Sequence, residues 1–256
     1  MKPPLRIAVL ECDTPLDQTR HKYGGYGGVF KALLEAGAIA LNDPRLSSLP
    51  HHGLELTNFD VVNAEQYPSL DDIDAILLTG SRQNAFDNHP WIVKLVEFTR
   101  KVLEEQERVR VIGVCFGHQI VGRALGMKVD RSYAGWEISV TPMELTDRGM
   151  EIFKVDGKTM SLHQMHRDII LEYPDDVEKL GSSPRCFVQG MYKKNKVIAV
   201  QGHPEFNQDI VTELLNSRHH VGVFDDIMFK DGMDRVGKNH DGVVVSQAFL
   251  RFLLDD

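Results

Sequence analysis

Four apolar stretches in the first half of the chain predict β-strands of the kind that lie buried in a parallel sheet. They are Leu5–Leu10, Leu54–Val62, Asp74–Gly80 and Val109–Val114. Amphipathic segments between them predict two helices, Val29–Ala36 and Trp91–Glu107. Gly37 is expected to end the first helix, and Pro90 to begin the second. Strands and helices that alternate in this way predict a parallel sheet with helices on both faces.

Shorter elements are expected after Gly126. They are strands within Lys128–Val140 and Lys158–Leu171, a polar turn at Thr146–Met150, a hairpin of Cys186–Met191 and Lys196–Gln201, and helices over 207–215, 224–237 and 243–254. Asn207 is the expected N-cap of the first of these helices, and the second has a weak pattern. Because no repeat, low-complexity segment or linker interrupts the sequence, residues 1–256 are expected to form a single domain.

Composition narrows the class of protein. The chain has 256 residues, 42% of them hydrophobic and 26% charged, with a net charge of −8. This acidic balance argues against a nucleic-acid partner bound through phosphate contacts. The three cysteines lie far apart, which indicates a reducing compartment, here the cytoplasm, rather than a disulfide framework or a cysteine-rich zinc site. The first apolar run is too short for a signal peptide, and none approaches the roughly 18 residues of a membrane-spanning helix, so no membrane association is expected.

Candidate chemistry centres on Arg110–Leu125, which reads RVIGVCFGHQIVGRAL. A strand, a sharp glycine-flanked turn and a helix are expected there, with Cys115 at the turn. This order resembles the nucleophile elbow of serine hydrolases. A helix N-terminus beside the sulfur favours a thiolate, and the amide of Phe116 is placed to donate to an oxyanion. The segment alone leaves open a structural cysteine beside a glycine-rich turn.

An activated cysteine needs a base, and the base needs a group that orients it. His203 follows the apolar run Val197–Val200 and precedes Glu205 by two positions. In an extended segment, residues two apart point the same way, so the carboxylate would hold the imidazole. Cys115, His203 and Glu205 are therefore the candidate nucleophile, base and orienting group. Spacing alone leaves a surface turn as the alternative for the last two.

A second glycine-rich segment, Tyr23–Gly28, has four glycines in six residues but fits no phosphate-binding pattern. We interpret it as the flexible start of a helix or as a wall of a small-molecule site. His163, His166 and Asp168 have ligand-type side chains, but they lack the further spaced ligand and supporting contacts of a metal site, and no metal is expected. Alternation along a strand would instead bring one or two of them near the mouth of the active site.

The segments Gly113–Gln119 and Gln201–Glu205, read together, resemble the class I (triad) glutamine amidotransferase family, whose patterns are G-x-C-x-G-x-Q and a strand-terminal H-P-E. Gly202 departs from this family, which often has Phe before H-P-E. Finer similarities to stand-alone members, among them γ-glutamyl peptidases and fungal amidotransferase-like proteins, lie at Tyr23–Tyr26, Gly80–Ser81, Gly135–Trp136 and His163–Asp168. The resemblance implies an α/β fold, a flavodoxin-like three-layer sandwich with a mostly parallel central sheet and a small antiparallel sheet.

The same resemblance implies roles for further residues. The oxyanion hole would combine the amide of Phe116 with that of Gly80 or Ser81. The two ends of a glutamine substrate would be held by residues at three places, namely Gln119, the backbone around Tyr133, Gly135 and Trp136, and the backbone of His163, Gln164 and Met165.

The expected activity is hydrolysis of the γ-amide bond of glutamine or of γ-glutamyl peptides through a thioester on Cys115, with no cofactor. One alternative is a glutaminase subunit that passes ammonia to a separate synthetase, since the chain has no room for a synthetase domain. A second is a non-catalytic binding or regulatory protein with the same fold, and a third is a different cysteine hydrolase on this scaffold. The sequence does not identify the leaving amine.

Overall fold

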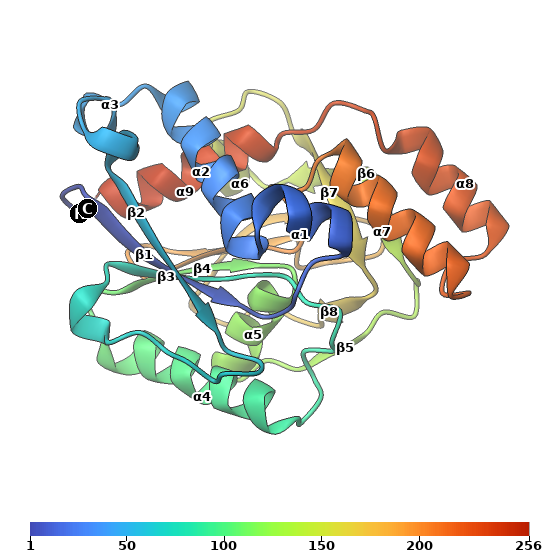
Figure 1. The fold of residues 1–256 in the computed structure, drawn as a ribbon, viewed down its shortest axis with the longest axis horizontal. Helices are drawn as coiled ribbons and strands as arrows, with labels where there is room; N and C mark the ends of the chain where they lie inside the picture. The colour runs from blue at the N-terminus through green and yellow to red at the C-terminus, as the bar shows by residue number, and fades with distance from the viewer. Residues whose placement is uncertain (256) are drawn as a thin grey trace.

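One nine-stranded mixed sheet runs through the computed structural model, which describes residues 1–255 (Figure 1). Its strand order is β2-β1-β3-β4-β11-β10-β9-β6-β7. The parallel half contains β1 (Leu5–Glu11), β2 (Leu54–Asp60), β3 (Ala75–Leu78), β4 (Arg110–Val114) and β11 (Val197–Val200). The antiparallel half contains β10 (Gly190–Lys193), β9 (Glu178–Ser182), β6 (Glu137–Leu145) and β7 (Thr159–His166). A separate small antiparallel sheet pairs β5 (Val129–Arg131) with β8 (Asp168–Ile170).

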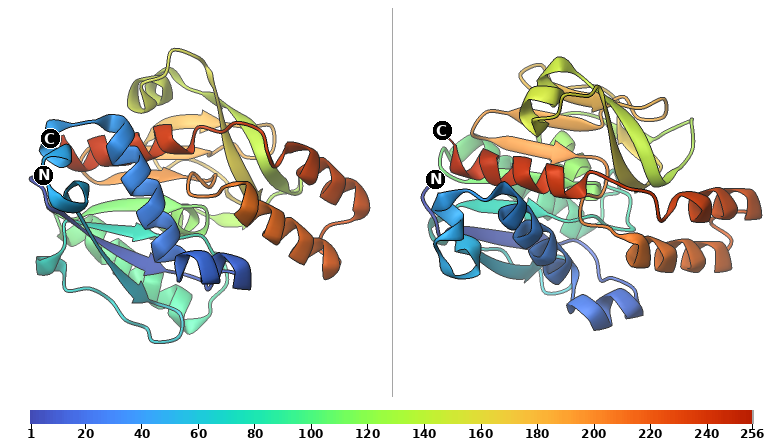
Figure 2. Two further views of the ribbon diagram at one scale, coloured as in Figure 1. Left: turned by 45° about the horizontal axis from the view of Figure 1, so that its top comes forward. Right: turned by 90° about the horizontal axis from the view of Figure 1, so that it is seen from above.

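Helices cover both faces of the parallel strands, which confirms the predicted three-layer arrangement (Figures 1 and 2). The helices are α1 (Asp17–Tyr23), α2 (Tyr26–Leu41), α3 (Pro44–Ser47), α4 (Pro90–Glu105), α5 (Phe116–Ala124), α6 (Asp147–Phe153), α7 (Gln208–His220), α8 (Asp226–Arg235) and α9 (Gly242–Leu254), with 3-10 turns at Pro50–Gly53 and Leu70–Asp72. Ile7 and Val9 of β1 pack in the core beneath α2 and α9, whereas Ala8 and Leu10 pack in the core beneath α4 and α5. This two-sided burial explains why the strand sequence is continuously apolar.

The predicted end of the helix at Gly37 is wrong, because α2 continues to Leu41 and is capped by Asn42 in the left-handed region (φ 50°). Gly37 is needed for packing. A Cβ at this position would lie 2.1 Å from Oγ of Ser246, so only glycine lets α2 approach α9 this closely.

Three expectations for the second half also change. The segment expected as a polar turn, Thr146–Met150, begins helix α6, since the Thr146 hydroxyl accepts a hydrogen bond from the Gly149 amide (2.9 Å). The weak pattern after Phe224 gives a regular helix, α8. Strand β9 was not predicted, because its sequence EKLGS contains a single large apolar residue. Asn207 caps α7 as predicted by accepting from the Ile210 amide (3.1 Å), although the helix extends beyond Leu215 to His220.

The helical pair α7 and α8 extends beyond the edge of the sheet (Figure 2). Glu213 of α7 fixes the first turn of α1 to this pair, since its carboxylate accepts hydrogen bonds from the amide (3.0 Å) and hydroxyl (2.6 Å) of Thr19. Segments from the two ends of the chain therefore lie side by side next to the carboxyl ends of the parallel strands, where α/β sheets place ligands. No helix within residues 1–255 is long and apolar enough to cross a membrane.

Candidate active site

Cys115 occupies a strained turn between β4 and α5, and the predicted order of strand, turn and helix is confirmed. Its backbone has φ 52° and ψ −105°, a conformation that costs non-glycine residues on the order of 1–3 kcal/mol. The glycines on either side permit the turn. A Cβ at Gly113 would lie 2.9 Å from the Gly117 carbonyl oxygen, and one at Gly117 would lie 2.3 Å from that of Leu78. Their predicted role in close backbone contact is therefore confirmed.

Replacing Gly117 with alanine is expected to destabilise the protein by about 2–4 kcal/mol, because the added methyl group meets rigid backbone. Urea denaturation measures the change. Gly157→Ala is the matched control, since a Cβ there meets no atom within 4 Å, and a change within about 0.5 kcal/mol is expected. Equal stability of the two variants would contradict the steric account of the turn.

His203 and Glu205 form a buried pair just after β11. The imidazole Nδ1 lies 2.7 Å from a Glu205 carboxylate oxygen, and both side chains are almost fully buried. The His203 ring stacks on Phe206, with centroids 3.9 Å apart, and its backbone amide donates to the His163 carbonyl (2.8 Å). The first two contacts orient the ring, and the third fixes the backbone of His203. The predicted meeting of His203 and Glu205 is therefore found in the structure.

Electrostatics link this pair to Cys115. Burial alone would lower the pKa of His203, but the negative charges of Cys115 and Glu205 and hydrogen bonding to both raise it to about 10. The imidazolium is thus the favoured form of His203 at neutral pH. Cys115, His203 and Glu205 come from two strand ends that are adjacent because β4 pairs with β11.

His203 is expected to titrate near pH 10 in the intact protein and at a lower pH in Cys115→Ala. The variant lacks the thiolate that raises the pKa, whereas burial continues to lower it. NMR of the ring carbons and nitrogens across a pH series measures this directly. Cys186→Ala, which removes another buried thiol, should leave the His203 titration unchanged. An identical midpoint in the intact protein and Cys115→Ala would contradict coupling between the two side chains.

The candidate oxyanion donors lie on two neighbouring segments. Gly80 follows β3, and a Cβ built on it would lie 2.7 Å from Cε1 of His203, so its backbone borders the imidazole. Phe116 is the first residue of α5, and the next amide, that of Gly117, donates to the Thr79 carbonyl (3.1 Å). This bond ties the start of α5 to the loop containing Gly80 and Ser81. The structure thus brings all three residues to the same end of the sheet as Cys115.

A pocket opens beside His203. It is lined by the loop after β1 and the start of α2 (Asp13, Thr14, Leu16, Tyr26), the loop after β3 (Gly80, Ser81, Arg82), α7 (Leu214, Ser217, Arg218), and Met165, His203 and Phe206. Tyr26 belongs to the glycine-rich segment Tyr23–Gly28, interpreted from the sequence as the start of a helix or a wall of a small-molecule site, and it does line this pocket. Several lining residues were not among the predicted site residues, the polar and charged ones being Asp13, Thr14, Arg82, Ser217 and Arg218. Only proximity in the fold identifies them, because the sequence around them carries no motif.

Only some of the residues predicted to bind the substrate lie near the pocket. Met165 lines the pocket, whereas Tyr133 is fully exposed on the surface and does not line it. Gly135 lies in the same loop with φ +81° and open space where a Cβ would be. Gln119 is buried, and its Nε2 donates to the Gln201 side chain (3.0 Å) and the Asp168 carbonyl (2.7 Å). The Trp136 indole packs edge-on against Phe224, with ring centroids 5.1 Å apart.

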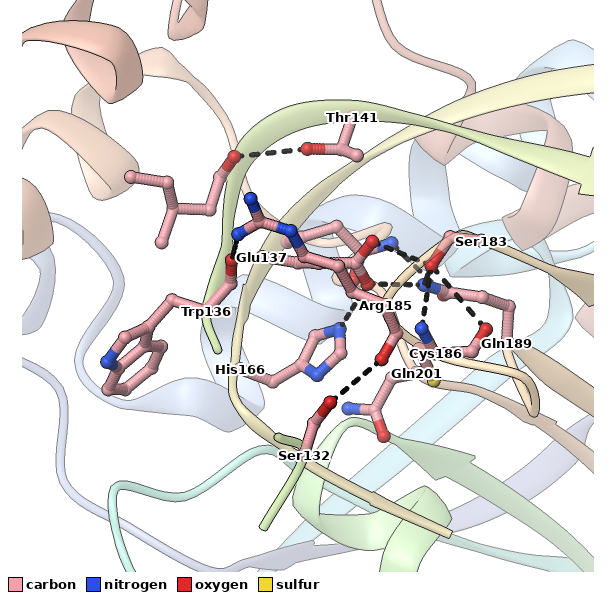
Figure 3. A network of polar contacts seen from close by, with 12 residues as sticks. Ser132, Trp136, Glu137, Thr141, His166, Ser183, Arg185, Cys186, Gln189 and Gln201 are labelled. Carbon is pink, nitrogen blue, oxygen red and sulfur yellow. Dashed lines mark hydrogen bonds and ion pairs between the residues drawn. The ribbon is translucent and has the colours of Figure 1, made fainter. Parts of the chain in front are cut away.

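A buried polar network joins residues in or next to strands β6, β7, β9 and β10 (Figure 3). Glu137 contacts His166 Nε2 (3.1 Å) and accepts hydrogen bonds from Ser183 (2.6 Å) and Gln189 (2.8 Å). Burial alone would raise the pKa of Glu137, but His166 and Ser183 hold it below its ordinary value. Gln164 joins the network by donating to Gln189 (3.1 Å). Because a Cβ at Gly202 would lie 2.9 Å from Nε2 of Gln164, glycine is required before His203 in this chain.

His163 is fully buried behind His203, and its ring lies 4.7 Å from that of His240. Burial and these two histidines lower the pKa of His163 to about 3, so it is neutral. Among residues 1–255, no three His, Cys, Asp or Glu side chains gather in a way that could hold a metal ion. His166 and Asp168 belong instead to other contacts, His166 to Glu137 and Asp168 to Arg131 (3.1 Å).

Comparisons with known proteins agree with this geometry. The family described as Glutamine amidotransferase class-I matches residues 46–218. A glutamine amidotransferase-like protein of Schizosaccharomyces pombe is 32% identical over 97% of this chain and 98% of its own length. Gamma-glutamyl peptidase 2 of Arabidopsis thaliana is 25% identical over 91% of this chain and 89% of its own length.

Solved structures show the same flavodoxin-like fold. A glutamine amidotransferase from Thermotoga maritima superposes with a TM-score of 0.70 over 98% of this chain and 99% of its own, at 15% identity. The family match covers well over half of the chain and includes Cys115, His203 and Glu205. The chain therefore belongs to the class I glutamine amidotransferase family.

Proposed function

We propose that this protein hydrolyses γ-glutamyl amide bonds, with Cys115 as nucleophile, His203 as acid and base, and Glu205 as the group that orients His203. The observation that carries the proposal is the buried His203–Glu205 pair, whose imidazole interacts with Cys115 at the wall of a pocket. This arrangement supplies a thiolate, a proton for the leaving amine and a fixed imidazole orientation.

The proposed reaction has two stages. The Cys115 thiolate attacks the γ-carbonyl carbon, and the amides of Phe116 and Gly80 or Ser81 stabilise the oxyanion, each worth roughly 3–4 kcal/mol in comparable sites. The His203 imidazolium then protonates the departing nitrogen, which leaves a γ-glutamyl thioester. In the second stage neutral His203 takes a proton from water, hydroxide attacks the thioester, and glutamate and the thiolate are released.

The relatives support an acyl group of this type, since several plant relatives are named gamma-glutamyl peptidases. Under this proposal Gln119, Gly135 and the Gln164–Met165 backbone hold the amino and carboxyl ends of the glutamyl group. The leaving amine would be an amino acid or peptide, or ammonia when glutamine is the substrate. The cytoplasm is the proposed location, since the protein has three free thiols and no disulfide among residues 1–255.

A turnover comparison tests the proposal. Purified protein is incubated separately with glutamine, glutathione and several γ-glutamyl dipeptides, and released glutamate is measured. Glutamate release from at least one γ-glutamyl compound, blocked by an electrophile that mimics glutamine, is expected. Release of glutamate from none of them would refute hydrolysis. Hydrolysis of glutamine that rises strongly only when a synthetase is added would support the alternative of an ammonia-supplying subunit.

A further inference from the structure

Arg218 is a pocket residue that the catalytic scheme leaves without a role. It lies in the last turn of α7, and its side chain lines the pocket beside His203. Its Nη1 atom is buried and has no hydrogen-bond partner among residues 1–255. Aromatic rings support the guanidinium, with its Cζ 5.0 Å from the centroid of Trp136 and 5.8 Å from that of Phe224. A buried donor without a partner is costly in an empty site, so a ligand acceptor is the simplest explanation.

The other charged groups around Arg218 already have partners. Arg82, also in the pocket wall, is paired with Asp13, whose carboxylate accepts from both Nε (3.0 Å) and the backbone amide (2.8 Å) of Arg82. Glu213 of α7 accepts hydrogen bonds from Thr19 and Gln18. His203 is paired with Glu205 (2.7 Å). Within residues 1–255 Arg218 therefore has no direct ion-pair partner, although Asp13 and Cys115 favour its charge from a distance, and an anionic ligand group would complement it.

The position of His203 decides which part of a substrate meets Arg218, provided that the proposed hydrolysis is correct. His203 must face the nitrogen that leaves, because it donates the proton to it. The pocket that His203 lines, together with Arg218 and Tyr26, is thus the leaving-group side of the site. Of the residues proposed for the ends of the glutamyl group, Gln119, Gly135 and Gln164 do not line this pocket, whereas Met165 lines it and marks where the glutamyl group would meet it.

We propose that Arg218 binds the carboxylate of the leaving group, so that the preferred substrates are γ-glutamyl peptides whose departing amine is an amino acid or short peptide with a free carboxyl end. A guanidinium pairs with a carboxylate through two parallel hydrogen bonds and is suited to this task. Glutamine, which releases uncharged ammonia, lacks the group that Arg218 recognises. This inference rests on the proposed function and specifies its substrate class.

Pairs of substrates that differ only in the leaving-group carboxylate isolate the contribution of its recognition by Arg218. γ-Glutamylglycine and glutathione are each compared with their C-terminal amides, which differ only in the loss of the carboxylate. The intact protein should prefer the acids, and Arg218→Gln should reduce the acid-to-amide ratio of kcat/KM roughly 10- to 100-fold. Arg167→Gln is the matched control, because Arg167 also lies over the Trp136 ring (5.1 Å) but does not line the pocket. Its acid-to-amide ratio should equal that of the intact protein.

Two outcomes would overturn the inference: no preference for the acids in the intact protein, or an equal loss for acids and amides in Arg218→Gln. The second outcome would place Arg218 at the glutamyl end or in a structural role. Calorimetric binding of the same pairs to Cys115→Ala gives a readout without turnover. If the intact protein cleaves neither the acids nor the amides, but binds the acids more tightly in a way that depends on Arg218, hydrolysis is refuted and carboxylate recognition is retained. Turnover without any preference for the acids would support hydrolysis and refute carboxylate recognition by Arg218.

Discussion

Cys115→Ala is expected to lower kcat for γ-glutamyl hydrolysis by about 10⁵- to 10⁶-fold, since removal of a nucleophile leaves only binding and oxyanion stabilisation. The loss should be specific because Cys115 is the cysteine at the pocket end of β4. Cys12 and Cys186 are buried and hydrogen-bonded to backbone carbonyls, and burial raises the pKa of both thiols. They are expected to be inert toward alkylating reagents in the folded protein.

Steady-state kinetics and active-site labelling check this prediction together. Mass spectrometry should find a glutamine-mimicking electrophile on Cys115 alone. Cys186→Ala serves as the control for loss of a buried thiol, and its kcat should remain within about tenfold of the intact protein. Turnover by Cys115→Ala at more than a hundredth of the wild-type rate would exclude the thioester route.

Glu205→Gln should lower kcat by on the order of 10³- to 10⁴-fold with little change in the fold. The amide has nearly the same shape as the carboxylate, so the 2.7 Å contact with His203 can be kept. Its charge is lost, however, and with it part of the interaction that raises the pKa of His203. The imidazolium formed during the reaction is then less stable, and the ring can adopt the wrong tautomer.

Glu137→Gln is the matched control for this variant. Glu137 also lies buried against a histidine, His166 (3.1 Å), but it belongs to a separate polar network (Figure 3) and does not line the pocket. Its kcat is expected to fall by less than about tenfold, whereas its stability falls by about 1–3 kcal/mol. Similar kinetic losses in the two variants would show that burial of the charge, rather than its position beside His203, is what matters.

The pattern of apolar residues was sufficient to predict the strands of the parallel half of the sheet and the main helices that pack on them. The inner strands β3, β4 and β11 are buried at every position, so their sequences are mainly apolar, whereas the edge strand β2 is partly exposed and carries polar residues. The antiparallel half was harder to predict. In β9 only Leu180 is a large apolar residue, and its pairing depends on β6 and β10, which are distant in sequence. The end of α2 was misplaced because the reason for Gly37 lies in the contact with Ser246, more than two hundred positions away.

The candidate catalytic residues could be predicted because each follows a strand in a short motif with its own steric demands. Gly113, Gly117 and Gly202 all lie where a Cβ would collide with neighbouring atoms. The part of the pocket wall formed by α7 and by the loop after β1 could not be predicted. Arg218 occupies an ordinary helical turn, and its importance depends on Trp136 and on the burial of its Nη1 atom, which no local pattern records.

The pocket wall has a further consequence for protein engineering. Asp13, Thr14, Leu16 and Tyr26 precede residue 46, where the family match begins, whereas Gly80, Cys115, His203 and Glu205 all lie within it. One side of the pocket is thus contributed by a segment outside the family match, whereas the side that contains Arg82 and Arg218 lies within it. A combinatorial library restricted to positions 13–26 would reshape one side of the pocket and leave the chemical apparatus intact, a route by which one scaffold can diversify its range of substrates.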